Sequence, residues 1–364
     1  MRYHPRFSMY ILKSFALWNG LVLLILSMTT LLFSLVELIR RSQTHAFIKF
    51  SQLFKVALLQ LPSILDQLSP LVLLFSTIIL MWTLQKRSEI IVMRSLGYSI
   101  WSIVSPMILG VVIYSVAYFF LLNPFVASTK NIHQHYQDKV FRKSENLSSV
   151  SKSGLWLRHK KEEGGYSIVH VNHINSPNIF GQSVIYDFNR FGQFIKRYDV
   201  KQIDIQNEKW LLKNPLLTES NDIQKPVDDF SWNINLTLKK IKQTFQPPSS
   251  LSFWQLPNFI KLIEKTGLSG TEHLLYLYNL LMKPFLFISM ILIGSVSAFA
   301  SVRKRNSFVF ILFGILAGFS FHFLHQIFHA LGEALKIPLV FSSLIPTCIS
   351  LLIGLTLLLH LEEG

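Results

Sequence analysis

Two ionisable side chains stand inside long apolar runs of the sequence. Asp66 lies between two prolines, Pro62 and Pro70, and Lys283 directly precedes Pro284. Charged groups are costly to bury in hydrocarbon, so residues of this kind are functional candidates that tend to face a cavity. The alternative is that the two side chains pair with each other or extend to the membrane surface. We favour a cavity-facing role for Lys283 and leave both interpretations open for Asp66.

Three histidines, His322, His325 and His329, follow the spacing i, i+3 and i+7. On a helix this spacing places all three on one face. Such a stripe could bind a metal ion, but a metal site usually also needs a nearby carboxylate or cysteine and a preformed pocket. We therefore favour a polar seam that faces a lumen or another helix, and we predict no metal.

The sequence offers no pattern typical of an enzyme. It contains no Walker A motif, no HExxH, no CxxC and no Ser-His-Asp arrangement. We therefore predict a protein that catalyses no reaction and needs no cofactor, so that any ATP it uses is hydrolysed by another chain.

A short charged segment, QKRSEIIVMRSLG at 85–97, separates two apolar runs. Ser88 is a candidate N-cap, Glu89 falls in the first helical turn where the helix dipole favours an acid, and Gly97 ends the helix. A short positively charged loop between two spans is expected in the cytoplasm. Its apolar residues are too many for a linker and predict a helix that enters a groove on a partner, as when a membrane subunit receives force from a separate motor. The candidate contact residues are Arg87, Ser88, Glu89, Ile90, Ile91, Val92, Met93, Arg94 and Gly97.

Basic residues gather where the first two spans are expected to reach the outer membrane surface. They are Arg40, Arg41, Lys49 and Lys55. They either anchor the helices by extending into the headgroup region or recognise a phosphorylated lipid headgroup through the arginine forks. The residues alone leave these readings almost even, with a slight preference for recognition because the outer side needs no positive charge for orientation. The polar residues that we assign to a cavity between the spans are Ser34, Glu37, Asp66, Lys283, His322 and His325.

The composition predicts a membrane protein. Half of the 364 residues are hydrophobic, 30 are phenylalanine, and 15% are charged, which is too apolar for an ordinary soluble protein. The single cysteine, Cys348, excludes an intramolecular disulfide. The net charge of +15 favours anionic headgroups over nucleic acid, because no RNA-binding motif or zinc spacing accompanies it. The first apolar run lacks a small-residue cleavage site, so we expect it to be retained as a span.

Six apolar runs are long enough to cross a bilayer, three on each side of a polar insert. We expect an α-helical membrane protein with membrane parts at 1–124 and 273–364 and no internal repeat. The third span is expected to end at Asn123-Pro124. The expected spans are 11–39, a second that begins from the amphipathic stretch 46–61 and reaches Leu84, 100–124, 273–301, 307–330 and 339–360.

The insert, residues 125–272, alternates short apolar runs with turn residues. The runs lie at 167–173, 182–188, 194–205 and 209–213. Asn189 with Gly192, and Gln206 with Asn207, supply turns between them. This pattern predicts an antiparallel β-sandwich or jelly roll. The KPVDD stretch at 225–229 is expected to be a loop, and residues 252–266 an interfacial helix closed by Gly267.

The distribution of basic residues in short segments predicts the orientation of the chain. One side collects nine of them: Arg2, Arg6, Lys13, Lys86, Arg87, Arg94, Arg303, Lys304 and Arg305. The other collects five: Arg40, Arg41, Lys49, Lys55 and Lys336. This difference places both termini and the charged segment in the cytoplasm and the β-domain outside.

The segment QKRSEIIVMRSLGYS at 85–99 resembles the cytoplasmic coupling segment of the LptF/LptG permeases, which export lipopolysaccharide from the inner membrane of Gram-negative bacteria. SGLW at 153–156 is similar to the LptG branch of this family. VIYDFNRFG at 184–192, WNINLT at 232–237, the amphipathic helix after Leu251 and QIF at 326–328 fit the same branch. The resemblance covers essentially the whole chain, including the order of the spans and the position of the insert.

This resemblance implies a multi-pass protein of the bacterial inner membrane with a β-jelly roll in the periplasm. Its implied partners are an LptF-like permease, an LptB-like ATPase dimer and the bridge proteins LptC and LptA, with lipopolysaccharide as the cargo. By position, Glu89 would make the charged contact to the ATPase, with Arg87 and the apolar residues that follow in its groove. Arg40 and Arg41 would meet the lipid A phosphates, which favours recognition over anchoring. Two positions depart from the family pattern, since Ser34 stands near an expected lysine and His325 stands where an acid is common.

Two other functions fit the same architecture. One is an ABC-type exporter of a different lipid or a lipoprotein, which the identity of the co-purified lipid would distinguish. The other is a membrane scaffold with a periplasmic β-domain, which would have a packed β-domain and no cavity between its spans. A secondary transporter would require inverted repeats and facing broken helices, at which only the Pro62/Pro70 span hints.

Overall fold

The computed structural model describes residues 5–43, 48–141, 155–160, 165–172, 174–176, 179–206, 209–219, 224–233, 246–265, 270–302 and 307–363. The chain divides into two compact units. We call Met1–Tyr136, Ser249–Phe253 and Leu274–Gly364 the helical unit, and Gln137–Pro248 with Trp254–His273 the sheet unit. Each unit is described by itself.

Six helices in the described part of the chain are long and apolar enough to cross a membrane, which confirms the predicted number of spans. The first three spans are α1 (Pro5–Ser42), α2 (Phe50–Lys86) and the helix that begins with α4 (Ile100–Ala117). The last three are α8 (Thr271–Val302), α9 (Ser307–Glu333) and α10 (Leu339–Glu363). Most residues in the apolar windows of α2 and α8 are buried, whereas few in those of α1 and α9 are. Helices α2 and α8 therefore form the centre of the helical unit, whereas α1 and α9 present their apolar side chains outward.

The third span is longer than the sequence suggests. After α4 the helix continues through a π-helical turn, η1 (Tyr118–Leu122), into α5 (Asn123–Val140). The expected end at Asn123-Pro124 is therefore wrong. A proline removes one backbone donor and crowds the carbonyl four residues earlier. Here that position falls inside the π-helical turn, where the regular hydrogen-bond ladder is already interrupted.

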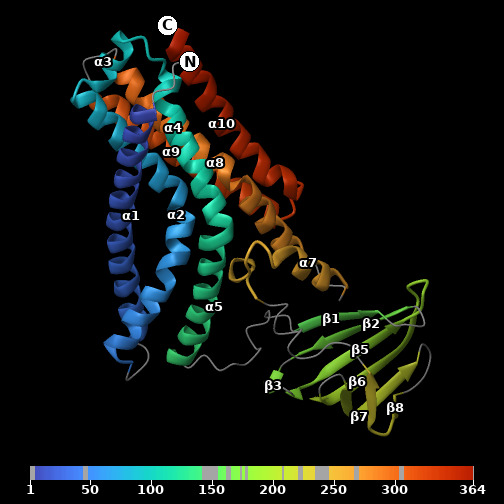
Figure 1. The fold of residues 1–364 in the computed structure, drawn as a ribbon. Coiled ribbons are helices and arrows are strands. Elements are labelled where there is room, and N and C mark those ends of the chain that lie inside the picture. The colour runs from blue at the N-terminus through green and yellow to red at the C-terminus, as the bar shows by residue number, and fades with distance from the viewer. Residues whose placement is uncertain are drawn as a thin grey trace. The chain divides into compact units, whose positions relative to one another are not determined.

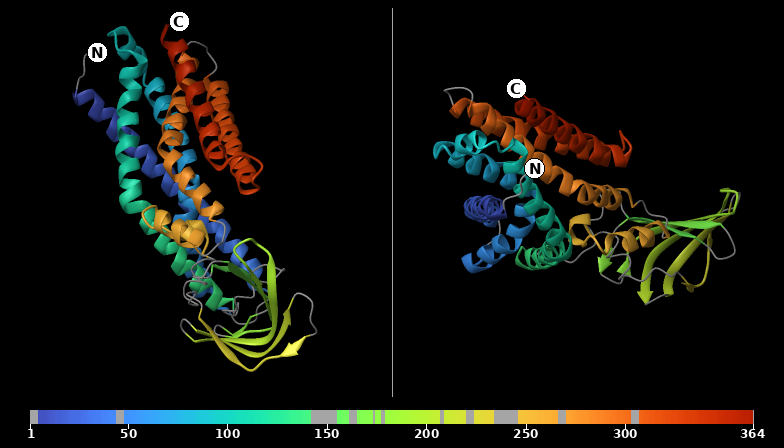
Figure 2. Two further views of the ribbon diagram at one scale, coloured as in Figure 1. Left: turned by 90° about the vertical axis from the view of Figure 1, so that its right-hand side faces the viewer. Right: turned by 45° about the horizontal axis from the view of Figure 1, so that its top comes forward.

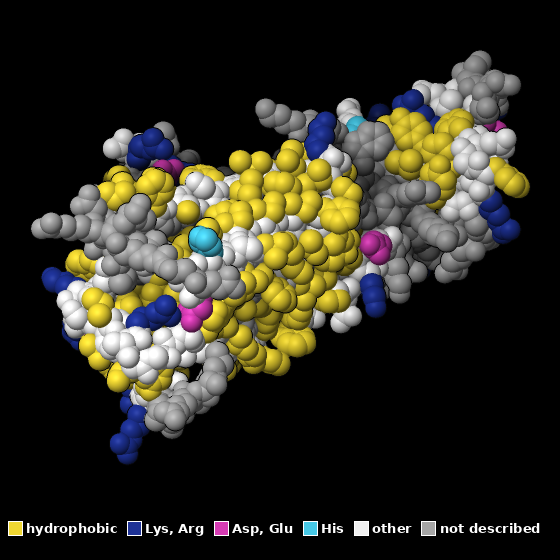
Figure 3. Space-filling model, turned by 90° about the horizontal axis from the view of Figure 1, so that it is seen from above, with side chains coloured by type: hydrophobic (Ala, Val, Ile, Leu, Met, Phe, Trp, Pro, Cys, Tyr) yellow, Lys and Arg dark blue, Asp and Glu magenta, His cyan; other side chains and the backbone are white. Residues whose placement is uncertain are grey.

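Close approach between helices depends on glycines that face small or flexible side chains. A Cβ placed on Gly294 of α8 would lie 3.0 Å from Thr77 Cβ of α2, and one on Gly318 of α9 would overlap the side chain of Leu74. Small residues let membrane helices pack closely, where van der Waals contact replaces the hydrophobic effect. On the outside of the molecule, hydrophobic side chains cover a broad area of the surface (Figure 3).

Both ends of the chain lie at the same end of the helical unit. The N-terminus, the C-terminus and the short helix α3 (Glu89–Ser95) are close together in Figure 1, and the second views agree (Figure 2). Three spans on each side of the insert bring the end of the chain back to the side on which it began, as the sequence predicts. The basic residues that the charge count assigns to the cytoplasmic side, where the structure describes them, therefore belong to this end of the helical unit. They are Arg6, Lys13, Lys86, Arg87 and Arg94.

The sheet unit contains one antiparallel sheet of nine described strands, which confirms the predicted insert between the third and fourth spans. Its centre is the long strand β6, which pairs with β5 and β4 on one side and with β7 on the other. Apolar side chains alternate along the strands and pack around Trp210, which is fully buried. The strands are β1 (Leu155–Lys160), β2 (Tyr166–Val171), β3 (Ile174–Ser176), β4 (Ile179–Phe180), β5 (Ser183–Phe188), β6 (Phe194–Gln206), β7 (Lys209–Glu219), β8 (Lys225–Pro226) and β9 (Phe230–Asn233).

Local sequence signals predict the turns of the sheet unit better than its short strands. Asn189 accepts hydrogen bonds from the backbone of Phe191 and Gln193, both at 2.9 Å, and Gly192 has a φ of 79°. The expected loop at 225–229 is wrong at its start, because β8 pairs there with β7. The predicted interfacial helix appears as α7 (Leu256–Lys265), while Gly267 and Asn207 lie outside the described residues.

Candidate functional site

The charged segment at 85–97 forms the end of α2, the helix α3 and the turn that follows. Ser88 precedes α3 but is not the cap we expected, because its backbone is left-handed (φ 60°) and its side chain makes no capping hydrogen bond. The predicted end at Gly97 is confirmed. Gly97 has a φ of 83°, and the N–H groups of Gly97 and Tyr98 donate to the carbonyls of Arg94 and Met93 at 3.0 and 3.1 Å. This is a Schellman ending, which satisfies the last carbonyls of the helix.

The apolar residues of α3 divide between its two faces. Ile90 and Met93 are buried in the main core of the helical unit, so the expectation that they enter a partner's groove is wrong. Ile91 and Val92 are exposed, and Leu96 in the following turn is 71% exposed. The spacing i, i+3 puts the two buried residues on one face, where they anchor α3. Sequence analysis missed Leu96, although it directly precedes the glycine that ends the helix.

Glu89 is held by a residue from the first span. The Oη of Tyr10 in α1 donates to the two carboxylate oxygens of Glu89 at 3.0 and 3.2 Å. Arg87 adds a looser ion pair, with Nη1 3.9 Å from Glu89 Oε1. The carboxylate predicted to contact an ATPase is therefore already in contact with α1. Nothing in the sequence signals this, because Tyr10 and Glu89 are 79 residues apart.

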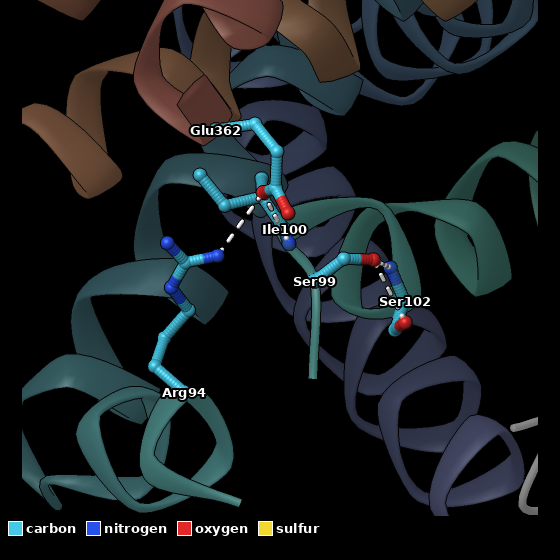
Figure 4. A network of polar contacts seen from close by, with 5 residues as sticks. All are labelled: Arg94, Ser99, Ile100, Ser102 and Glu362. Carbon is cyan, nitrogen blue, oxygen red and sulfur yellow. Dashed lines mark hydrogen bonds and ion pairs between the residues drawn. The ribbon is translucent and has the colours of Figure 1, made fainter. Parts of the chain in front are cut away.

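Arg94 is held by the last helix of the chain (Figure 4). Its Nη1 lies 3.1 Å from Oε2 of Glu362 in α10, and the backbone N–H of Ile100 donates to the same oxygen at 2.7 Å. Ser99 caps α4 beside it, since its Oγ accepts from the N–H of Ser102 at 3.2 Å. Glu362 therefore belongs to this site, and sequence analysis did not find it.

The paired arginines at the far end of α1 share one acid. Arg41 Nη2 lies 2.7 Å from Glu37 Oε1, and Arg40 Nη2 lies 3.5 Å from Glu37 Oε2. The side chains of Arg40 and Arg41 remain 75% and 58% exposed. Such exposed pairs within one helix contribute little to stability. The guanidinium groups thus remain accessible to an anion from outside the chain.

The other basic residues of this region lie at the start of α2. The backbone N–H of Lys49 donates to Gln52 Oε1 at 3.2 Å, and its side chain is exposed. Lys55 Nζ lies 4.8 Å from the ring centroid of Tyr136 in α5, a cation–π distance. Ser34 is half-buried on α1, one helical turn before Glu37.

The two charges inside the spans form a pair. Lys283 Nζ of α8 lies 2.5 Å from Asp66 Oδ1 of α2 and 2.8 Å from Tyr118 Oη at the start of η1. A cavity of about 360 Å³ lies between α1, α2 and the third span; Asp66 and Tyr118 line it. Lys283 does not line this cavity but is paired with Asp66. The cavity-facing role that we expected for Lys283 is therefore wrong for this cavity. Asp66, and not Lys283, is the charged residue that lines the cavity, next to the π-helical turn.

The histidine stripe on α9 forms no metal site among the described residues. His329 Nδ1 lies 3.4 Å from Glu333 Oε1, one turn further along the same helix. The Nδ1 atoms of His322 and His325 are buried and have no hydrogen-bond partner within the described part of the chain. The arrangement fits the predicted polar seam on a helix whose apolar face is largely open.

Comparison with known families decides what kind of protein carries these features. Residues 9–360 match the family described as "Lipopolysaccharide export system permease LptF/LptG". The chain belongs to the LptF/LptG permease family. The match includes all six spans and the insert, and it confirms the resemblance found in the coupling segment.

Relatives of this permease are of the LptG type. It is 24% identical over 313 residues to the lipopolysaccharide export system permease protein LptG of Escherichia coli K12, covering 83% of this chain and 84% of the relative. It is 23% identical over 304 residues to LptG of Haemophilus influenzae, covering 79% and 80%. The permease is thus an LptG-type subunit for lipopolysaccharide export and a multi-pass protein of the inner membrane.

Proposed function

We propose that the permease pairs with an LptF-like permease and an LptB-like ATPase dimer, and that it takes lipopolysaccharide from the outer leaflet of the inner membrane. Its sheet unit, in the periplasm, would pass the lipid to LptC and LptA. The observation that carries this proposal is the family match over residues 9–360, which spans both units. The excess of basic residues on the side of α3 supports a cytoplasmic α3 and a periplasmic insert.

In this proposal the ATPase binds the outer face of α3. Ile91, Val92 and Leu96 form an exposed apolar surface on and just after a helix of seven residues, and Glu89 and Arg87 lie at its start. Apolar contacts in a groove supply binding free energy, and a charged pair fixes the register. Because Ile90 and Met93 are packed in the core of the helical unit, a force applied to the outer face of α3 is transmitted to the spans.

Extraction of the cargo requires such a force. Each CH₂ group that leaves hydrocarbon costs about 0.8 kcal/mol, and lipopolysaccharide carries several acyl chains. The permease has no Walker A motif, so the free energy must come from another chain.

Arg40 and Arg41 are the groups that we propose to bind the phosphorylated headgroup, together with Lys49. A phosphate can replace Glu37 as their partner, because an exposed intrahelical pair is worth roughly 0–1 kcal/mol. A bidentate arginine–phosphate contact is stronger. Glu37 then keeps the two side chains extended and ready in the absence of lipid.

The coupling role is tested by Glu89→Lys in the assembled complex. We expect ATP hydrolysis to continue while lipid release to the bridge proteins falls at least tenfold. Asp228→Lys, an exposed acid in the sheet unit, is the control for charge reversal and should release lipid normally. Normal release by Glu89→Lys would contradict the coupling role.

The headgroup role is tested by photo-crosslinking from a probe amino acid at Ile39, which is exposed beside the arginines. Arg40→Ala with Arg41→Ala should reduce the yield of lipopolysaccharide crosslinks several-fold. Lys13→Ala is the control, because Lys13 is an exposed cation at the opposite end of the same helix. An unchanged yield in the double arginine variant would refute recognition at this site.

A further inference from the structure

One carboxylate connects three helices at the end of the helical unit where α3 lies. Glu362 Oε2 contacts Arg94 Nη1, which lies before the turn at 96–99, and the N–H of Ile100, which lies after it. The two contacts therefore bridge the turn between α3 and α4, and Glu362 itself belongs to α10 (Figure 4).

The placement of this acid is unfavourable on its own helix. Glu362 stands in the last turn of α10, where the carbonyl end of the helix dipole repels a negative charge. At the first turn of α4 the sign is reversed, and the N–H of Ile100 is one of the donors that no intrahelical acceptor can satisfy. The side chain of Glu362 is 25% exposed, so water screens these contacts only in part. The carboxylate is thus stabilised by α3 and α4 and not by the helix that carries it.

Burial alone does not decide which helices follow α3 when it moves. Ile90 and Met93 share one core with residues of α1, α2, α4, α8 and α10, among them the fully buried Leu358. The connection from α2 to α3 runs through Ser88, which lacks a side-chain cap. On the other side, the Schellman ending at Gly97 and the two bonds of Glu362 fix the turn. The directional side-chain contacts of α3 therefore lead to α1 at its start, through Tyr10 and Glu89, and to α4 and α10 at its end, through Glu362.

We propose that Glu362 is a positioning residue that fixes the angle between α3 and α4 and ties both to the end of α10. Displacement of α3 then moves α4 and α10 as one body, and part of the motion bypasses α2. This inference rests on the proposed coupling role of α3, but its geometric part can be tested without ATP.

The geometric test uses the native cysteine. Cys348 is exposed on α10, and the sequence contains one cysteine only, so Leu96→Cys supplies a second spin-label position next to α3. Distances between the two labels are measured by pulsed electron resonance in the full-length chain with its partner permease in lipid nanodiscs. We expect one narrow distribution in the parent protein and a clearly broader one in Glu362→Ala.

Two variants separate the charge from the hydrogen bond. Glu362→Gln keeps an acceptor for the N–H of Ile100 but loses the ion pair with Arg94, so its distribution should be intermediate. Glu333→Gln, an exposed acid at the end of α9, is the matched control and should leave the distribution unchanged. A distribution in Glu362→Ala as narrow as the parent's would overturn the proposal, and the mild Glu362→Gln change keeps the test available if the alanine variant fails to fold.

The transport test uses Glu362→Ala and Glu362→Gln in the chain that keeps Leu96, with the ATPase present. We expect lipid released per ATP hydrolysed to fall about threefold to tenfold in Glu362→Ala, as loss of charge-assisted bonds predicts, with ATPase binding retained. If Glu89→Lys uncouples export while Glu362→Ala does not, the positioning role is wrong and the coupling role stands. If neither variant uncouples export, the coupling role of α3 itself fails, whatever the spin-label distances show.

Discussion

Lys283 and Asp66 form an ion pair with an Nζ–Oδ1 distance of 2.5 Å inside the helical unit. The pair joins α2 to α8, and therefore the three spans before the insert to the three after it. Tyr118 Oη, at the π-helical turn of the third span, accepts a second hydrogen bond from Lys283 Nζ at 2.8 Å. With side-chain exposures of 12% and 13%, both charges depend on each other for solvation. The ion pair thus holds α2 against α8 at the edge of the cavity.

Removal of one partner of this pair should be worse than removal of both. Asp66→Asn or Lys283→Met alone leaves a buried charge without its partner and should cost about 3–5 kcal/mol. The double variant should recover much of this loss, because neither charge then remains. Thermal unfolding of the parent, the two single variants and the double variant in one detergent gives the coupling free energy between the two residues. Lys336→Met, which removes an exposed lysine of a loop, should change little. Additive losses in the double variant would show that the two residues act independently.

Tyr10→Phe should free Glu89 for its partner. The substitution removes only the hydroxyl that contacts the carboxylate, and the bond is exposed, so stability should change by less than about 1 kcal/mol. With the intramolecular competitor gone, the affinity of the ATPase for the permease should rise about twofold to tenfold. Titration of labelled ATPase onto nanodiscs measures it. Weaker binding would indicate that Tyr10 presents Glu89 to the partner and does not compete for it.

The sheet unit should lose a specific stabilising contact in acid. Gln202 Nε2 donates to Asp204 Oδ1 at 2.6 Å, and Lys213 forms an ion pair with the other oxygen. The hydrogen bond from Gln202 and then the contact with Lys213 lower the pKa of Asp204 below its ordinary value.

A lowered pKa in the folded state means that the contribution of Asp204 is complete above the unfolded pKa of about 4 and disappears as pH falls through the folded value. Asp204→Asn should therefore lower stability by about 1 kcal/mol at pH 7 and make no difference at the lowest pH. The melting temperatures of both proteins between pH 2 and 7 provide the measurement. Asp228→Asn, at an exposed loop position, is the control and should show no such trend. A constant difference at every pH would contradict this assignment.

Two glycines should respond in opposite ways to the same added methyl group. A Cβ on Gly354 of α10 would lie 2.8 Å from Leu292 Cβ of α8, an atom too close to the backbone to swing away. Gly354→Ala should therefore destabilise the helical unit by about 1–3 kcal/mol. At Gly20 of α1 no described atom lies within 4 Å of the new methyl group, so Gly20→Ala should stabilise the helix by up to about 1 kcal/mol. Equal shifts in melting temperature would rule out the tight α8–α10 contact.

Local patterns in the sequence predict much of this fold. Long apolar runs identify six spans because a bilayer requires about twenty apolar residues for each crossing. Alternation identifies the main strands, and Asn189, Gly192 and Gly97 mark the ends of elements because their chemistry acts within a few residues. The continuation through Pro124 escapes such reasoning, since it depends on a π-helical turn that no single residue announces.

The sequence by itself determined the class of protein, the number of spans and the position of the insert. Only the tertiary structure decided which side of α3 faces outward, that Asp66 meets Lys283, and that Tyr10 and Glu362 hold the two ends of α3. The physical reason is range. Hydropathy and turn chemistry act between neighbours in the chain, whereas these contacts join residues 79 to 268 positions apart, whose meeting depends on how all six helices pack.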